Sequence, residues 1–312
     1  MAEGLIVGQV QALPVRGVRL KDAVANYLAT IPSTNTRRGY AIALNQLVRD
    51  FGADSDVGLL EAGRVGGWFT FKWSSKSAQT FNVRLASLRR ACEYWRKQQW
   101  LVGDPLVRLV SRKVPPDHTR AMTRDEVARL LAKDVPLRER VLWTMLYETA
   151  ARADELLLLD IPDLDMANRC GTVTRKGGAR DVVAWQTGTA RLLPRLLAGR
   201  KKGPVFLTDR KAKPGVAVGD IDPSTLRGRL SYRRAAELFE HHTSDFGRGP
   251  FTLHQLRHSK LTHAAEDGAS TPMLMRMSGH TSVRSLGKYS RPSAEALIRW
   301  QAQTDPAARR RR

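Results

Sequence analysis

The segment that most constrains the fold begins about a third of the way along the chain of 312 residues. Residues 108–119, RLVSRKVPPDHT, contain two prolines and three basic side chains and show no periodic pattern. Because proline disrupts both helices and sheets, this segment predicts a linker between two separately folded parts. We therefore expect an irregular arm over residues 1–18, a helical domain over 19–110, a linker over 111–120, a second domain over 121–304 and a basic tail over 305–312.

The first domain is predicted to be all-α. Apolar residues recur at helical spacing, most clearly in the last of four segments, where one side carries Phe81, Leu85, Leu88, Cys92 and Trp95. No zinc-ligand spacing, glycine-rich phosphate loop or internal repeat occurs in this half of the sequence. The four predicted helices cover residues 20–29, 36–50, 62–73 and 77–99.

Five arginines of this domain are candidates for contacts with phosphate groups. Arg37 and Arg38 come at the first turn of the second helix, where backbone N–H groups are also free. Arg84, Arg89 and Arg90 lie on the fourth helix, largely away from its apolar side. The alternative for these arginines is an ordinary solvated helix face, and the sequence leaves that choice open.

The second domain is predicted to be mainly α with a small antiparallel sheet. Thr123 is a helix N-cap with Glu126 as its capping-box partner. Strand-forming runs at residues 171–174 and 181–185 flank a basic connection with two glycines, which predicts a hairpin. Further helices are expected over residues 136–149, 189–198, 223–239 and 293–304, and a short apolar strand over 205–207.

The net charge predicts a large polyanion as the partner. The chain carries 52 Lys and Arg against 30 Asp and Glu, which gives a formal charge of +22. Residues 1–117 hold 17 basic and 9 acidic side chains, and residues 118–312 hold 35 and 21. Because both parts are basic, we expect both to contact the polyanion, as in a protein that encircles nucleic acid. Solubility is the alternative explanation of the charge taken by itself.

Cysteine usage and hydropathy favour a cytoplasmic protein. Cys92 and Cys170 are far apart in sequence and sit in apolar or strand-like surroundings, which is typical of a reducing compartment without disulfides. The N-terminus has no basic start followed by an apolar run, so no signal peptide is expected. No apolar segment approaches the roughly 20 residues that span a bilayer, and we expect no membrane partner.

The candidate active site centres on residues 251–292. This stretch supplies His254, Arg257, His280 and Tyr289 in that order, and no acidic residue falls among them as a natural metal ligand. Guanidinium and imidazole groups bind phosphate oxygens, and a tyrosine can act as a nucleophile. The sequence therefore predicts a phosphate-handling site without a metal or a cofactor.

Six positions resemble the active-site set of the tyrosine recombinases, the phage-integrase and Xer-type family. The first arginine of that family stands in a motif like T-G-x-R-x-x-E-L, and residues 149–156 of this chain are TAARADEL. A lysine follows that arginine by 24 positions, residues 254–258 are HQLRH, and a Gly-His pair precedes a tyrosine by nine positions. The resemblance covers residues 120–303, and the first domain is similar to the family's core-binding domain by pattern alone. The six matching residues are Arg152, Lys176, His254, Arg257, His280 and Tyr289.

Four residues depart from the family pattern, and none of the departures removes a catalytic group. They bear on the subfamily more than on the chemistry. Ala150 replaces a common glycine, Ser278 a usual leucine, Leu286 a frequent threonine and Ala179 a frequent lysine.

The resemblance implies a site-specific DNA recombinase that cuts and rejoins double-stranded DNA without metal or ATP. It implies that Tyr289 attacks phosphorus and forms a 3′-phosphotyrosyl bond, which releases a 5′-hydroxyl. Arg152 and Arg257 would stabilise the negative charge that builds up on the phosphate oxygens.

The remaining matched residues are given supporting roles by the same resemblance. Lys176 is expected to act as general acid for the leaving 5′-oxygen, and His254 to take the tyrosine proton. His280 would donate a hydrogen bond to the phosphate. Glu155, one helical turn past Arg152, is expected to orient an arginine from outside the reacting set.

Two other functions stay open from the sequence: a type IB topoisomerase-like enzyme that relaxes DNA, and a non-catalytic DNA-binding relative. Taken singly, Arg152 could be a buried ion-pair partner, His280 a turn residue and Tyr289 a core residue. The intact set of six argues against the non-catalytic relative.

The C-terminal helix favours a recombinase over a topoisomerase. Leu297, Ile298 and Trp300 cluster on one side of it, and the family uses such a helix to dock on a neighbouring protomer. We therefore expect a homotetramer on two recombining sites, with accessory DNA-bending or directionality proteins as further partners. Packing of the helix on its own domain is the alternative.

Overall fold

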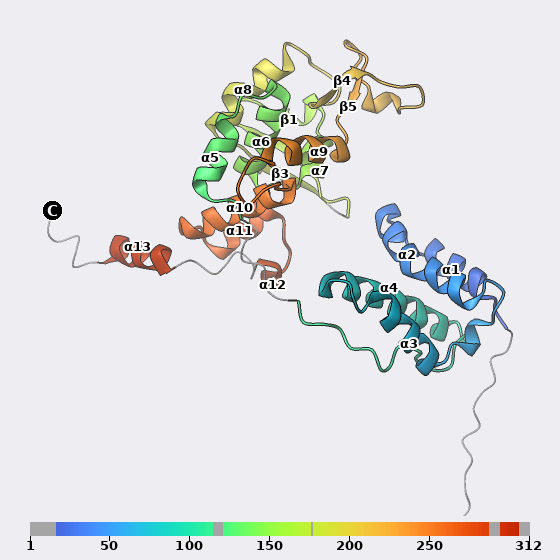
Figure 1. Ribbon diagram of the computed structural model, residues 1–312. Helices are drawn as coiled ribbons and strands as arrows, with labels where there is room; N and C mark the ends of the chain where they lie inside the picture. The colour runs from blue at the N-terminus through green and yellow to red at the C-terminus, as the bar shows by residue number, and fades with distance from the viewer. Residues whose placement is uncertain (1–16, 115–120, 176, 287–293, 306–312) are drawn as a thin grey trace, which may run out of the picture. The chain divides into compact units, whose positions relative to one another are not determined.

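The computed structural model describes residues 17–114, 121–175, 177–286 and 294–305 (Figure 1). Internal contacts divide the chain into two compact units, Met1–Pro115 and Pro116–Arg312. Most of the predicted arm, part of the predicted linker and the predicted tail after residue 305 lie outside the described residues. No helix of the described part is long and apolar enough to cross a membrane.

The first unit consists of helices around one apolar core. All four predicted helices are present, with ends within two residues of those expected. Ser33 and Ser77 accept hydrogen bonds from backbone N–H groups three residues ahead, and these caps fix where the second and fourth helices begin. The elements are α1 Leu20–Ala29, α2 Thr34–Phe51, the 3-10 turn Val57–Leu59, α3 Ala62–Trp73 and α4 Ala78–Lys97.

The apolar side of α4 forms the centre of this core, as its periodicity predicts. Trp95 is completely buried, and its indole N–H donates to the carbonyl oxygen of Ala23 at 2.9 Å, which joins α4 to α1. Phe69 and Phe81 pack edge to face with ring centroids 5.0 Å apart, which brings α3 against α4. A single core therefore holds the helices of this unit together.

The second unit is built around α6, Leu137–Thr149, which contacts helices on several sides (Figure 1). Its residues are apolar around most of the circumference, as expected for a helix with no solvent face. The predicted capping box of Thr123 and Glu126 is present at the start of α5. The other helices are α5 Arg124–Ala132, α7 Ala153–Leu157, α8 Thr187–Leu197, α9 Tyr232–Thr243, α10 Leu253–Glu266, α11 Thr271–Ser278, α12 Val283–Leu286 and α13 Ala294–Thr304.

Two small antiparallel sheets complete the second unit. The predicted hairpin is present as β2, Cys170–Thr174, and β3, Arg180–Ala184, with β1, Leu164–Asp165, on the outer side of β2. Val173 lies opposite Asp181 in the register of this hairpin. The second sheet pairs β4, Leu207–Lys211, with β5, Arg227–Arg229. The mainly helical prediction with a small sheet is thus confirmed, with a second sheet added.

Two local predictions in this unit are wrong. The strand expected over residues 205–207 begins only at Leu207, because the backbone N–H of Val205 donates to the carbonyl oxygen of Leu159 and not to a strand. The helix expected over residues 223–239 begins only at Tyr232. Asp222 caps the intervening turn, where its Oδ2 accepts from the backbone N–H of Thr225 at 2.8 Å. That turn directs the following residues into β5 instead of a helix.

Candidate active site

Arg152 is positioned by a sharp turn between α6 and α7. Ala150 ends α6 with φ +52° and ψ +23°, a left-handed conformation that explains why glycine is common at this place in the family. Arg152 is then the N-cap of α7, and its Nη1 donates to Oε1 of Glu155 at 2.7 Å. The Arg152 side chain is 34% exposed, whereas that of Glu155 is 4% exposed. A buried carboxylate therefore holds an accessible guanidinium.

Arg257 fastens the Arg152 turn to the segment before His280. It lies on α10, is 1% exposed, and donates through Nη1 to the carbonyl oxygen of Ala150. Its Nη2 donates to the carbonyl oxygen of Ser278 at 2.7 Å. Two of its five N–H donors thus join parts of the chain that are 128 positions apart, Ala150 and Ser278. Its guanidinium is covered in this structure, and its contact with phosphate stays a prediction.

The two matched histidines belong to the two segments nearest this junction in sequence, α10 and the residues after Ser278. His254 is exposed and precedes Arg257 by one turn of α10. His280 follows Gly279, whose φ of +61° ends α11, and its backbone N–H donates to Oγ of Ser278 at 3.3 Å. His258 is buried, and its Nδ1 lies 3.3 Å from Oγ1 of Thr262, a local contact within α10.

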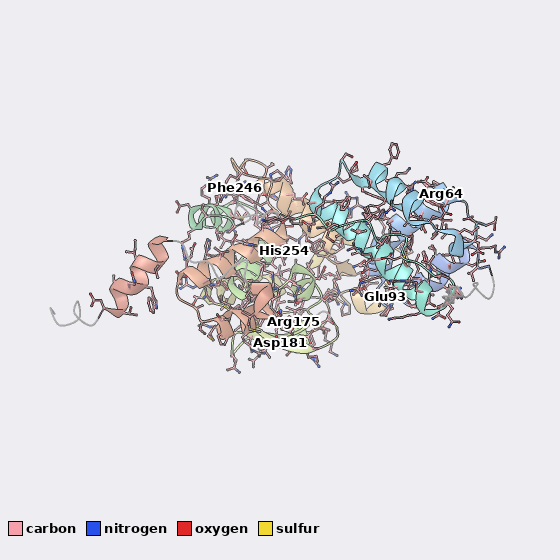
Figure 2. All side chains as sticks on the ribbon, turned by 90° about the horizontal axis from the view of Figure 1, so that it is seen from below. Arg64, Glu93, Arg175, Asp181, Phe246 and His254 are labelled. Atoms are coloured by element: carbon pink, nitrogen blue, oxygen red, sulfur yellow. The ribbon has the colours of Figure 1, made fainter. Side chains whose placement is uncertain are left out.

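The hairpin adds charged residues that the sequence analysis did not single out. Arg175 follows β2, is 8% exposed, and donates through Nη1 to Oε2 of Glu155 at 2.6 Å. Its Nε donates to Oδ2 of Asp181 at 3.1 Å, and these two residues lie close together in Figure 2. Lys176 directly follows Arg175 in sequence, but both Lys176 and Tyr289 lie outside the described residues.

Arg276 on α11 completes the set around Asp181. Its Nη1 donates to Oδ1 of Asp181 at 2.5 Å. Burial raises the pKa of the Asp181 carboxyl, but the N–H of Val182 and the guanidinium groups of Arg175 and Arg276 outweigh burial and hold that pKa below its ordinary value. The Arg175–Asp181 pair could be inferred from the sequence, because the two residues have opposite charges and stand six positions apart on a predicted hairpin. No sequence signal points to Arg276, which is 95 positions from its partner.

The five arginines proposed for phosphate contact in the first unit fall into two groups. Three of them donate to backbone carbonyl oxygens of the same unit, so part of their hydrogen-bonding capacity serves the fold. Arg38 and Arg90 are exposed, and the described residues give neither of them a hydrogen bond or a close ion pair. The donors of the first group and their acceptors are Arg37 to Ile31, Arg84 to Gly39 and Arg89 to Leu109.

The described residues contain no cluster of three or more His, Cys, Asp or Glu side chains that could hold a metal ion. The charged groups near the matched residues are mainly guanidinium groups, with Glu155 and Asp181 as their acceptors. Such an arrangement suits the binding of an oxyanion such as a phosphate diester.

Comparison with known proteins decides the family. The sequence model described as the phage integrase family matches residues 120–296, which is more than half of the chain. The chain belongs to this family of tyrosine recombinases. As a tyrosine recombinase it carries the matched residues Arg152, His254, Arg257 and His280 in the part of the second unit that the structure describes.

Individual tyrosine recombinases match most of the chain. Tyrosine recombinase XerC of Mycobacterium sp. (strain JLS) is 27% identical in an alignment of 307 positions that covers 92% of this chain and 98% of that protein. Tyrosine recombinase XerC of Bifidobacterium longum (strain DJO10A) is 30% identical over 207 residues, 66% of this chain and 56% of that protein. The first relative therefore aligns with both units.

Solved structures of the same family share the fold. A lambda integrase dimer bound to a COC′ core site superposes with a TM-score of 0.68 at 14% identity, over 91% of this chain and 83% of that one. The Tn1549 transposon integrase in complex with a circular intermediate DNA gives a TM-score of 0.66 at 16% identity, over 91% and 99%. These likenesses establish the fold at low sequence identity.

Proposed function

We propose that the protein is a site-specific recombinase that cuts and rejoins duplex DNA through a 3′-phosphotyrosyl intermediate. The observation that carries the proposal is the junction made by Arg257, which joins the turn before Arg152 to the segment before His280. Separate stretches of sequence that match the family's active-site set thus meet at one place. Family membership supplies the chemistry that such a set performs.

In the cleavage step, the phenolic oxygen of Tyr289 forms a bond to phosphorus while the bond from phosphorus to the 5′-oxygen breaks. His254 takes the phenolic proton, and Lys176 gives a proton to the departing 5′-oxygen. Arg152 stabilises the negative charge on the phosphate oxygens, and its guanidinium is accessible for this role. Arg257 assists at the same phosphate.

The supporting groups fit this scheme. His280 donates to the phosphate, and Glu155 keeps Arg152 in place through a 2.7 Å ion pair. Phenol has a pKa near 10, so the tyrosine is a good leaving group when the 5′-hydroxyl attacks in the reverse direction. The phosphotyrosyl bond therefore retains the free energy needed for resealing, without ATP.

We further propose that the protein works in the cytoplasm as a homotetramer on two DNA sites, with accessory DNA-bending or directionality proteins as optional partners. The support for an oligomer is α13, whose residues Leu297, Ile298 and Trp300 are 53%, 65% and 55% exposed. A helix with three large apolar side chains in solvent is suited to dock on a neighbouring protomer. Its exposure speaks against packing on its own domain.

Covalent capture tests the cleavage chemistry. Duplexes selected for binding from a random-sequence pool are nicked near the cleavage position, so that the released fragment diffuses away and the covalent complex accumulates. We expect a protein–DNA adduct on denaturing gels for the wild type and none for Tyr289→Phe, which should still bind DNA. No adduct from the wild type, or an adduct that persists in Tyr289→Phe, would sink the mechanism.

Strand exchange separates the recombinase from the topoisomerase alternative. Two labelled duplexes of different length that both carry the selected site should yield hybrid-length products. Relaxation of supercoiled plasmids that lack the site, without hybrid products, would instead favour a topoisomerase. Binding without adduct or products would favour the non-catalytic relative.

A further inference from the structure

The hairpin β2–β3 is tied to two helices by one chain of ion pairs. Arg175, at the end of β2, contacts Glu155 on α7 at 2.6 Å and Asp181 on β3 at 3.0 Å. Asp181 in turn contacts Arg276 on α11 at 2.5 Å. This chain of ion pairs therefore runs from α7 through the hairpin to α11, and negative and positive side chains alternate along it.

We propose that Asp181, through Arg175, is a positioning residue that sets the place of Lys176 relative to the scissile phosphate. This inference rests on the proposed function, in which Lys176 is the general acid. Asp181 touches no reacting atom in this scheme. It acts on the residue next to the acid, because Arg175 immediately precedes Lys176 in sequence.

Within this chain of ion pairs, the buried pairs that Arg175 makes with Glu155 and Asp181 are the ones that hold the hairpin in place. The side chains of Arg175, Glu155 and Asp181 are 8%, 4% and 16% exposed. Ion pairs out of water hold a definite geometry, and removing one partner leaves a buried charge without compensation. The Arg276 side chain is 66% exposed, so its pair with Asp181 is screened by solvent and contributes less.

Arg175 also packs against Gly279, the residue just before His280. A Cβ atom on Gly279 would lie 2.7 Å from both Cζ and Nε of Arg175, so the Arg175 guanidinium would have to shift to make room for it. The absence of a side chain there allows the Arg175 guanidinium to lie against the backbone just before His280. The Arg175 guanidinium thus adjoins α7, the hairpin and the backbone just before His280.

The position of Lys176 affects the cleavage rate because Lys176 donates a proton in that step. A general acid must be within hydrogen-bond reach of the leaving oxygen, and it contributes about 10²–10⁴-fold to rate. A misplacement of about 1 Å can lower the rate by about 10²-fold. The hairpin is short, and Arg175, which directly precedes Lys176 in sequence, is anchored on α7 through Glu155. Loss of the ion pair between Arg175 and Asp181 should therefore reduce the contribution of acid catalysis to the cleavage rate.

A substrate with sulfur in place of the 5′-bridging oxygen tests this directly. When the P–S bond breaks, the leaving group departs as a thiolate, whose conjugate acid has a pKa near 8.5, so no general acid is needed. We would measure single-turnover cleavage of the oxygen and sulfur substrates by the full-length protein. The variants are Asp181→Asn, Arg276→Ala and Lys176→Ala.

Glu237→Gln is the matched control. Glu237 is a carboxylate held by two arginines, Arg233 and Arg234, as Asp181 is, but it lies on the exposed surface of α9. The same carboxylate-to-amide change should leave the cleavage rates of both substrates unaltered. Thermal unfolding of each variant reports whether the fold persists.

The proposal predicts that Asp181→Asn cuts the oxygen substrate about 10²-fold more slowly than wild type but the sulfur substrate at close to the wild-type rate. Lys176→Ala should show the same pattern, and Arg276→Ala a weaker version of it. Wild-type rates of Asp181→Asn on both substrates, or equal losses on both, would overturn the positioning role. Lack of sulfur rescue in Lys176→Ala would overturn it as well. If the wild type cuts neither substrate, the proposed function fails instead.

Discussion

At the scale of single residues, two alanines in the same backbone conformation have different surroundings. Ala150 and Ala198 both end helices in the left-handed region, with φ of +52° and +49°. For a residue other than glycine, that conformation costs about 1–2 kcal/mol. Replacing the alanine by glycine removes this cost, but the more flexible unfolded chain lowers the free energy of unfolding by about 0.4–1 kcal/mol. Ala150 is fully buried, so its methyl also contributes about 0.8 kcal/mol, whereas Ala198 is exposed.

We therefore expect Ala198→Gly to raise the free energy of unfolding by about 0.5–1 kcal/mol, and Ala150→Gly to leave it nearly unchanged. Urea denaturation of the two variants and the wild type measures both values. A stabilisation by Ala150→Gly as large as that by Ala198→Gly would show that the buried methyl contributes nothing.

The matched residues can be recognised from the sequence because they stand in short motifs with fixed spacing, and their catalytic roles stay predictions. Arg152 and Arg257 could be named without knowing that Arg257 donates to the carbonyl group of Ala150. Asp181 and Arg276 could not be found in this way. Their pairing depends on how α11 meets the hairpin, which is a property of the tertiary fold and leaves no local pattern.

At the scale of elements, the fourth helix of the first unit carries arginines with two different tasks. Arg84 is half-buried and donates to the carbonyl oxygen of Gly39 at 2.8 Å, which ties α4 to α2. Arg90 is exposed on the same helix. We expect Arg84→Gln to lower the free energy of unfolding by about 1–2 kcal/mol, because a hydrogen bond from a charged donor is lost.

Arg90→Gln should leave stability within about 0.5 kcal/mol of wild type but weaken DNA binding. Losing one phosphate contact should reduce the slope of log affinity against log salt by about 1. Chemical denaturation and binding titrations at several salt concentrations measure the two effects. The assignment would be wrong if Arg90→Gln destabilised the fold and left the salt slope intact.

The β4–β5 element shows why the sequence prediction failed locally. The sequence predicts one helix over residues 223–239, but the turn at Asp222 has the stronger local preference. Its Oδ2 accepts from Ser224 and from both the N–H and the hydroxyl of Thr225, and its Oδ1 accepts from Arg200 at 3.2 Å. Periodicity does not register such side-chain caps, so the start of α9 was placed too early.

That cap also predicts a pH dependence of stability. Burial raises the pKa of Asp222, but hydrogen bonds from Thr225 and Ser224 and the pair with Arg200 outweigh it and hold the pKa at about 2. Because this lies below the unfolded value of about 3.9, the carboxylate contributes about 2 kcal/mol at neutral pH. The contribution is complete above about pH 5 and is lost as the pH falls through about 2.

We expect Asp222→Asn to be less stable than wild type by about 2 kcal/mol at pH 7, and this difference to fall to about half at pH 3. Urea denaturation across that pH range gives the free energies of unfolding. A difference that stays constant between pH 7 and pH 3 would contradict a titrating carboxylate at this turn.

At the scale of the whole molecule, the charge of +22 predicts strongly salt-dependent DNA binding. Both units are basic, and release of counterions from about six or more phosphates should lower affinity by about 10³-fold or more between 50 and 200 mM salt. Fluorescence anisotropy with a labelled duplex measures the slope. A slope equivalent to one or two phosphates would mean that the positive charge serves solubility and not DNA contact.

The central claim concerns the covalent bond to Tyr289, and mapping that bond is its most direct test. The adduct trapped on nicked duplex is digested with trypsin and nuclease, and mass spectrometry locates the nucleotide on the peptides. We expect a 3′-phosphate linked to the peptide that begins at Tyr289, together with a released 5′-hydroxyl that a polynucleotide kinase can phosphorylate directly. A linkage to another residue, or a bond through the 5′-phosphate, would contradict it.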